Sequence, residues 1–144
     1  MTRPLSALAL IAGIVLAAPA MAQTPPDPRI REIVYDPAAV YRIAGAFRTA
    51  THIVFSPEEI IRHAAIGDSV AWEVAAEGSV LFLKPRERHQ ATNLLVVTER
   101  AGVIRHYAFE LVARDPGDRA ALAYQVRFRY PADDQAQADR KSVV

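Results

Sequence analysis

Ser69 is the residue whose surroundings most suggest chemistry, because it follows Gly67 and Asp68 in the run IGDSVAW. A serine hydroxyl becomes a nucleophile when a base removes its proton and a third group orients that base. In hydrolases built on such a motif, an aspartate three positions before a histidine supplies both groups. None of the four histidines in this chain has an aspartate three positions before it. The sequence therefore favours a turn, in which the short side chains of Asp68 and Ser69 bond nearby backbone.

The histidines and acidic residues form no catalytic or metal-binding pattern either. The four histidines are widely separated along the chain: His52, His63, His89 and His106. They show none of the spacings of zinc motifs and no cysteine accompanies them, although His63 and His106 could meet across a sheet. Glu58 and Glu59 follow Ser56-Pro57, where acidic side chains are typical of the start of a helical turn. The sequence thus predicts no enzyme, no metal site and no cofactor.

The overall charge argues against nucleic acid as a direct ligand. The chain has 17 Lys and Arg residues against 16 Asp and Glu residues, for a net charge of +1. One of the basic residues, Arg3, lies in an N-terminal segment that we expect to be removed. Contact with phosphates needs a concentrated cationic surface, which a nearly neutral domain does not offer. We therefore expect protein partners and no direct binding of nucleic acid.

The first 22 residues are typical of a cleavable export signal. Arg3 gives MTRPLSALALIAGIVLAAPAMA its positive start, an apolar run follows, and Ala20-Met21-Ala22 forms a small-x-small cleavage site. The alternative is an uncleaved membrane anchor, but the apolar run is short for a span and no charged cluster follows it. We expect cleavage before Gln23 and a location in the periplasm. Because the sequence contains no cysteine, we expect no lipid attached at the cleavage site and no disulfide bonds.

The rest of the chain is predicted to form one domain. About 120 residues follow the cleavage site, enough for a single hydrophobic core. Residues 23–29, QTPPDPR, are expected to form a stiff tether, because their prolines cannot join a helix. Residues 30–130 hold the short apolar segments of a β domain. Residues 131–144 have almost no large apolar side chain and are expected to be a disordered polar tail.

Short apolar segments separated by turn residues predict about eight or nine short strands. The expected strands are IREIVYDP, AVYRIAG, THIVFSP, IIRHAAI, residues 70–75, SVLFLKP, TNLLVVT, VIRHYAFELVA and ALAYQVRFRYP. Strict alternation in residues 70–75 predicts that Gly67 and Asp68 form the turn of a hairpin, with Trp72 on the core face. No segment has a long helical period, and purely parallel sheets need crossover helices. The sequence therefore predicts an all-β fold, an antiparallel β-sandwich or a partly open barrel.

Five of these segments occur in an order that characterises one protein family. They are THIVFSPEEII, AIGDSVAW, LFLKP, TNLLVVT and a Tyr-x-Phe-x-Leu strand. Their motif positions are Gly67, Asp68, Ser69, Trp72, Leu81, Phe82, Leu83, Lys84, Pro85, Thr92, Asn93, Tyr107 and Phe109. Together with the opening DPRIREIVYDP, the segments resemble the N-terminal domain of the TrbG/CagX family over about residues 27–128.

The resemblance implies a structural role. Members of this family are periplasmic subunits of the outer-membrane core complex of type IV secretion and conjugation systems. They form a ring with a core subunit anchored in the inner membrane and with a small outer-membrane lipoprotein, and protein or nucleoprotein passes through it. The N-terminal domain is a β-sandwich in the inner layer of the ring. The family has no catalytic residues to transfer to this chain, so its motif residues are expected to form turns and core strands.

The resemblance also implies the partners. Family members usually continue through a linker into a second β domain, which binds the lipoprotein, whereas this sequence reaches Val144 in a segment like the start of that linker. The expected partners are other copies of the chain and the inner-membrane-anchored core subunit, and binding of the lipoprotein is in doubt. The alternative function is a free periplasmic module that binds a peptide or a small ligand in a cleft.

Overall fold

The structure, a computed structural model, describes residues 24–117 and 122–142, so the predicted signal peptide at residues 1–22 lies outside the described part. The elements of the described part are β1 (Ile30–Val34), β2 (Val40–Ala46), β3 (Thr51–Val54), β4 (Ile60–Ile66), β5 (Trp72–Glu77), β6 (Val80–Pro85), β7 (Thr92–Arg100), β8 (Val103–Arg114), β9 (Gln125–Arg129) and α1 (Pro131–Ser142).

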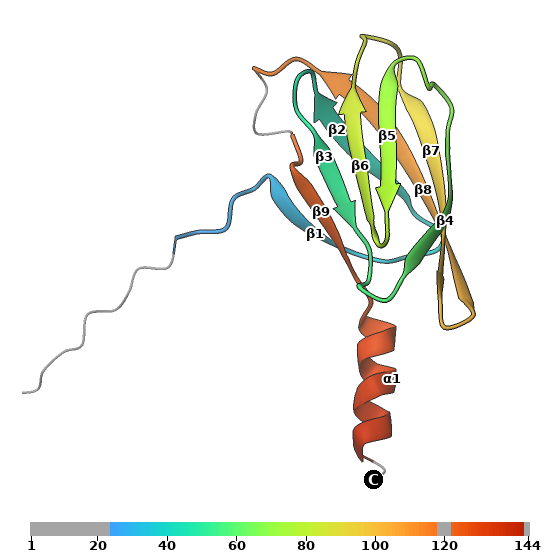
Figure 1. Cartoon of the computed structure of the whole chain (residues 1–144). Coiled ribbons are helices and arrows are strands. Elements are labelled where there is room, and N and C mark those ends of the chain that lie inside the picture. Colours follow the sequence, from blue (N-terminus) through green and yellow to red (C-terminus); the bar gives the residue numbers. More distant parts are fainter. Residues whose placement is uncertain (1–23, 118–121, 143–144) are drawn as a thin grey trace, which may run out of the picture.

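The strands form two sheets packed face to face, which confirms the predicted β-sandwich (Figure 1). Sheet A has the strand order β1-β9-β3-β6-β5, and sheet B has the order β2-β8-β7-β4. The two sheets do not close into a barrel. Six strands, β2, β3, β6, β7, β8 and β9, bury alternate residues on one face, which explains the period-two alternation of their sequences.

Aromatic side chains from both sheets meet in the centre of the core. Five aromatic rings form a cluster with centroids 4.6–6.4 Å apart: Tyr41, Phe55, Tyr107, Phe109 and Phe128. Tyr35 and Tyr130 extend this cluster at its edge. Most of these rings are tilted or edge-on to one another, the arrangement that the charge distribution of aromatic rings favours. Aliphatic side chains such as Ile53, Leu81 and Leu111 are fully buried around the cluster.

The prediction that the strands pair only in antiparallel fashion is wrong for three pairs. β1 with β9, β3 with β9, and β2 with β8 are parallel neighbours. The prediction was based on the rule that two parallel strands must be joined by a long crossover connection, which is usually a helix. Here each parallel pair joins strands that are distant in the chain, and the connecting polypeptide passes through the opposite sheet instead of a helix.

The predicted hairpin around Gly67 and Asp68 is also wrong. β4 pairs with β7 in sheet B, whereas β5 pairs with β6 in sheet A. Residues 67–71 therefore carry the chain from one sheet to the other. The alternation of residues 70–75 did not reveal this, because a strand buries one face in either sheet and the pattern does not identify its neighbour.

The C-terminal segment differs from the disordered tail predicted for residues 131–144, since Pro131–Ser142 form the helix α1. Pro131 suits the first helical position, Asp133 and Asp134 lie in the first turn, and Arg140 and Lys141 lie in the last. This distribution of charge complements the helix dipole. α1 projects from the end of the sandwich at which the β7–β8 hairpin also protrudes (Figure 1). A separate finding is that the described residues contain no helix with the length and apolar character to cross a membrane.

Candidate functional site

Asp68 organises the connection between β4 and β5. Its Oδ1 accepts hydrogen bonds from the backbone N–H groups of Val70 at 3.1 Å and Ala71 at 2.9 Å. Its Oδ2 lies 2.6 Å from Nδ1 of His89, in the loop between β6 and β7. The hydrogen bonds from Ala71 and His89 lower the pKa of Asp68, and Asp68 in turn raises the pKa of His89. Asp68 thus closes a tight turn and ties it to a second loop.

Ser69 does not have the surroundings of a nucleophile. Its side chain is exposed. Within residues 24–117 and 122–142, no hydrogen bond joins its hydroxyl to a histidine, and the nearby His89 is held by Asp68 and by Glu87, whose Oε2 lies 3.3 Å from Nε2. Activation of a serine nucleophile depends on a base in contact with its hydroxyl. The geometry therefore assigns the Gly67-Asp68-Ser69 motif to the turn.

We expect the substitutions Ser69→Ala and Asp68→Ala to have clearly different effects on stability. Ser69→Ala removes an exposed hydroxyl and should change the free energy of unfolding by no more than about 0.5 kcal/mol. Asp68→Ala leaves the N–H groups of Val70 and Ala71 without their acceptor, so urea denaturation should show a larger loss. Equal losses would contradict the role of Asp68, and esterase turnover that disappears in Ser69→Ala would contradict the structural role of the motif.

Two glycines, one in this turn and one on β2, allow close packing of motif residues. A Cβ atom placed on Gly67 would lie 2.6 Å from both Asn93 Oδ1 and Thr92 Oγ1, so the start of β7 needs a glycine opposite it. A Cβ atom placed on Gly45 would lie 2.9 Å from Trp72 Cη2. Close approach of backbone and side chains at these two positions explains why glycine is present there.

The remaining motif residues belong to the core or to its outer faces. Trp72 is nearly fully buried opposite Pro85 on β6, which agrees with its predicted place in the core. Leu81 and Leu83 of β6 are fully buried, as are Tyr107 and Phe109 of β8. Phe82 and Lys84 alternate with the buried leucines and are exposed. These motif residues thus lie in the core or on the outer faces of β5, β6 and β8.

The histidines do not gather into a metal site. His63 on β4 and His106 on β8 lie on either side of β7, and Val97 pairs with both of them, so the two histidines do not meet. The part of the chain that the structure describes contains no group of three His, Cys, Asp or Glu side chains placed to hold a metal ion.

A carboxylate lies buried between the sheets: the side chain of Glu59 is fully excluded from solvent. Glu59 Oε1 accepts hydrogen bonds from Thr98 Oγ1 at 2.6 Å and from the Tyr107 hydroxyl at 2.7 Å. Glu59 Oε2 accepts a hydrogen bond from the backbone N–H of Ser56 at 3.0 Å. Nη1 of Arg105 lies 3.3 Å from Oε1, a contact that is purely electrostatic because Nη1 makes no hydrogen bond in the described part. We call Glu59 and these partners the Glu59 network.

Sequence reasoning placed Glu59 at the start of a helical turn and missed this network. The available signal was the spacing Ser56-x-x-Glu59, in which the glutamate side chain reaches back to the serine N–H as in a capping box. The partners Thr98, Arg105 and Tyr107 come from β7 and β8, between 39 and 48 residues further along the chain. Only the packing of the two sheets brings them to Glu59.

The electrostatics of the network favour an ionised Glu59 and protonated tyrosines. Burial by itself would raise the pKa of Glu59, but hydrogen bonds from Thr98, Tyr107 and the Ser56 backbone outweigh it and leave the pKa below its ordinary value of 4.5. Burial raises the pKa of Tyr107 and of Tyr130 above the ordinary 10.0. The carboxylate therefore stays charged, and all its contacts serve the fold, since no substrate can reach it.

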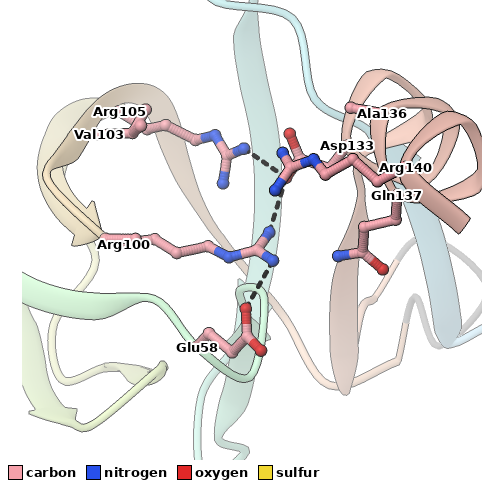
Figure 2. Close-up of a pocket in the computed structure, with 9 residues that line it drawn as sticks. Glu58, Arg100, Val103, Arg105, Asp133, Ala136, Gln137 and Arg140 are labelled. Atoms are coloured by element: carbon pink, nitrogen blue, oxygen red, sulfur yellow. Dashed lines mark hydrogen bonds and ion pairs between the residues drawn. The ribbon is translucent and has the colours of Figure 1, made fainter. Parts of the chain in front are cut away.

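A cleft of about 370 Å³ lies next to the network, between α1 and the β7–β8 hairpin (Figure 2). Asp133 of α1 is bound there by Arg100 of β7 at 2.8 Å and by Arg105 of β8 at 2.6 Å. Arg100 also binds Glu58 at 2.5 Å. These ion pairs occupy four of the charged side chains at the cleft, and Arg140 and Gln137 of α1 also line it. Most of the charged groups in this cleft are thus already paired within the chain, which does not favour the alternative of a ligand-binding module.

Comparisons with known proteins agree with the resemblance seen in the sequence. The CagX family, described as "Conjugal transfer protein", matches residues 28–143. The chain is 43% identical over 137 residues to "Type IV secretion system protein virB9" of Bartonella henselae, covering 88% of this chain and 47% of that protein. It is 36% identical over 138 residues to "Type IV secretion system protein PtlF" of Bordetella pertussis, covering 82% of this chain and 49% of that protein.

The chain thus spans about half the length of the curated relatives that it matches. The family match extends over most of the chain and includes the turn motif, the core strands and α1. The fold, the motif positions and the relatives all lead to one assignment: this chain belongs to the CagX family of conjugal transfer proteins.

Proposed function

We propose that this chain is a structural subunit of a type IV secretion or conjugation channel, and that it acts through protein–protein contacts in the periplasmic ring of the outer-membrane core complex. The observation that carries the proposal is the family match over residues 28–143, together with relatives that are named type IV secretion system proteins. The N-terminal segment supports export to the periplasm, with cleavage before Gln23. Other copies of this chain and the inner-membrane-anchored core subunit are the proposed partners.

The outer face of sheet B is the surface that we assign to contact with a second copy of the chain. A row of apolar residues crosses all four strands in register: Val40 on β2, Ala108 on β8, Leu95 on β7 and Ala65 on β4. Val40 and Leu95 are both exposed large apolar side chains. We call this set the apolar row, and its exposure on a folded domain is typical of a contact surface.

The outer faces of the two sheets differ in their charge. On sheet B, Arg42 binds Glu110 at 3.3 Å and Arg62 binds Glu99 at 2.7 Å, so the charges beside the apolar row cancel. The outer face of sheet A carries several exposed charged residues: Glu32, Glu73, Lys84, Arg127 and Arg129. Arg129 binds Glu32 at 3.2 Å and Arg86 binds Glu73 at 3.1 Å, which leaves two positive charges, Lys84 and Arg127, without an ion pair in the described part. A neutral, apolar face allows identical copies to approach without mutual repulsion, whereas a charged face favours solvent.

The test compares assembly of the wild-type chain with that of Leu95→Arg. The chain is exported together with the other core subunits of its system, purified through a tag, and sized by chromatography with light scattering. We expect the wild type to co-purify as a large ring, and Leu95→Arg to be recovered mainly outside it, because a buried unpaired charge disrupts an interface. Phe82→Arg on sheet A is the matched control, since Phe82 is 41% exposed and Leu95 is 49% exposed.

Each result bears on a separate part of the proposal. A wild-type chain that stays monomeric and never co-purifies with core subunits would contradict the proposed function. Normal assembly of Leu95→Arg, or equal loss with Phe82→Arg, would contradict only the assignment of the contact to sheet B.

A further inference from the structure

The helix α1 is attached to the sandwich almost entirely by polar contacts. None of its residues is buried, and its sequence, PADDQAQADRKS, contains no apolar side chain larger than alanine or proline. A helix of this kind has no apolar stripe with which to pack against a sheet. In Figure 1, α1 points away from the sandwich and does not lie against it. Something other than hydrophobic burial must therefore fix its direction.

Asp133, in the first turn of α1, makes the contacts that can do this. A single oxygen, Oδ2, is bound by Nη1 of Arg100 at 2.8 Å and by Nη2 of Arg105 at 2.6 Å. The two arginines belong to the two strands of one hairpin, whose tight turn has positive φ angles at Ala101 and Gly102. Figure 2 shows both guanidinium groups converging on Asp133 from the hairpin side. We call this arrangement the Asp133 clamp.

The clamp is itself held in place from the sandwich side. Arg105, whose side chain is mostly buried, also faces Glu59 and lies over the ring of Tyr130 at 4.4 Å from its centroid. The Tyr130 hydroxyl lies 2.8 Å from the Tyr107 hydroxyl, which in turn donates to Glu59. Tyr130, just before α1, thus anchors the start of the helix, and Asp133, one turn later, sets its direction. Charge-assisted hydrogen bonds of this kind are stronger and more directional than neutral ones.

We propose that Asp133 is a positioning residue: its clamp between Arg100 and Arg105 fixes the direction in which α1 leaves the sandwich. The role of this clamp in the assembly rests on the proposed function: a fixed helix would hold the chain that follows the sandwich at a defined angle to the ring. The direction itself is a property of one chain and is measured without any partner. Failure of the clamp and failure of ring assembly are therefore distinguishable.

The test measures the direction of α1 with pairs of spin labels. The chain contains no cysteine, so Ala75→Cys on β5 and Ala138→Cys on α1 introduce unique labelling sites. Double electron–electron resonance should give one narrow distribution of distances between the two labels in this doubly labelled chain. Adding Asp133→Asn should roughly double the width of that distribution while circular dichroism shows the same helix content, because the two charge-assisted bonds are lost and the helix is retained.

Asp134→Asn is the matched control. Asp134 lies in the same helical turn and has the same favourable position relative to the helix dipole, but within residues 24–117 and 122–142 its side chain makes no ion pair. We expect Asp134→Asn to keep the narrow distribution. Arg100→Gln, which removes one arm of the clamp and leaves the bond from Arg105, should broaden it to a smaller extent and serves as the test if Asp133→Asn does not fold.

Three results would overturn the proposal. They are a broad distribution already in the labelled wild type, an unchanged narrow distribution in Asp133→Asn and Arg100→Gln, and equal broadening by Asp133→Asn and Asp134→Asn. Greater broadening by the Asp133 and Arg100 variants than by the Asp134 variant would support it.

Discussion

Replacing Glu59 with alanine is expected to lower the free energy of unfolding by about 3–5 kcal/mol, the typical cost of removing one partner from a buried charge pair. The substitution leaves the hydroxyls of Thr98 and Tyr107 and the N–H of Ser56 without their acceptor in a region that solvent does not reach. It also removes one of the two carboxylates that Arg105 faces. Since domains of this size are stable by about 5–15 kcal/mol, urea denaturation should show a large shift.

The neighbouring Glu58 provides a matched control for this prediction. Glu58 also pairs with an arginine, Arg100, but its side chain is 69% exposed, whereas that of Glu59 is 0% exposed. Glu58→Ala should therefore cost at most about 1 kcal/mol, as is usual for exposed ion pairs. Similar losses for Glu58→Ala and Glu59→Ala would show that the Glu59 network does not stabilise the fold in the way that its geometry indicates.

The same carboxylate predicts a dependence of stability on pH. Although burial raises it, the pKa of Glu59 in the folded chain lies below its ordinary value of 4.5, because the hydrogen bonds to the carboxylate outweigh burial. Ionised Glu59 thus contributes stability above pH 4.5, and this contribution is lost as the pH falls through the lower pKa of the folded state. We expect the unfolding free energy of the wild type to fall more steeply below pH 4.5 than that of Glu59→Gln.

Replacing Trp72 with alanine is the second change for which we expect a large effect, a loss of about 3–5 kcal/mol in the free energy of unfolding. Its indole is nearly fully buried and lies close to Gly45, and Trp72 is the cross-strand partner of Pro85. Removal of so large a side chain leaves a cavity that the two neighbouring strands cannot fill. The measurement is urea denaturation at neutral pH, and a loss below that of an exposed substitution such as Ser69→Ala would contradict a core role for Trp72.

Gly45→Ala tests the same contact from the other side. The added Cβ would lie 2.9 Å from Trp72 Cη2 and 3.3 Å from Pro85 Cδ, so the substitution should overpack the core and cost about 1–3 kcal/mol. In the double variant, alanine at position 72 frees the space that the new methyl group needs. We therefore expect the double variant to lose less than the sum of the two single losses. Strict additivity would show that the two residues do not interact.

The sequence was sufficient to predict the sandwich but not the neighbours of each strand. Alternation such as that of Tyr107, Phe109 and Leu111 identifies a strand with one buried face, because side chains of a strand point to opposite sides in turn. It contains no information on which strand lies alongside. For this reason the parallel pairing of β1 with β9 and the crossing of residues 67–71 between the sheets were not predicted.

Among the polar contacts, too, those between near neighbours in the chain were predicted and those between distant residues were not. The turn role of Asp68 was predicted, because its backbone partners are two and three residues away. The Asp133 clamp was not, because Arg100 and Arg105 lie about 30 residues earlier in the chain and the acidic segment around Asp133 is typical of disorder when considered alone. Long-range charge pairs leave no pattern in a single sequence.

By itself, the amino-acid sequence determined the class of fold, the turn at Asp68 and the family resemblance, and it predicts export, since each of these depends on local pattern or on the order of short motifs. Only the tertiary structure decided where a buried carboxylate is neutralised, which outer face is apolar, and how α1 leaves the sandwich. The physical reason is that these features depend on side chains from distant segments meeting in space, and such meetings are set by the packing of two sheets rather than by neighbours in the chain.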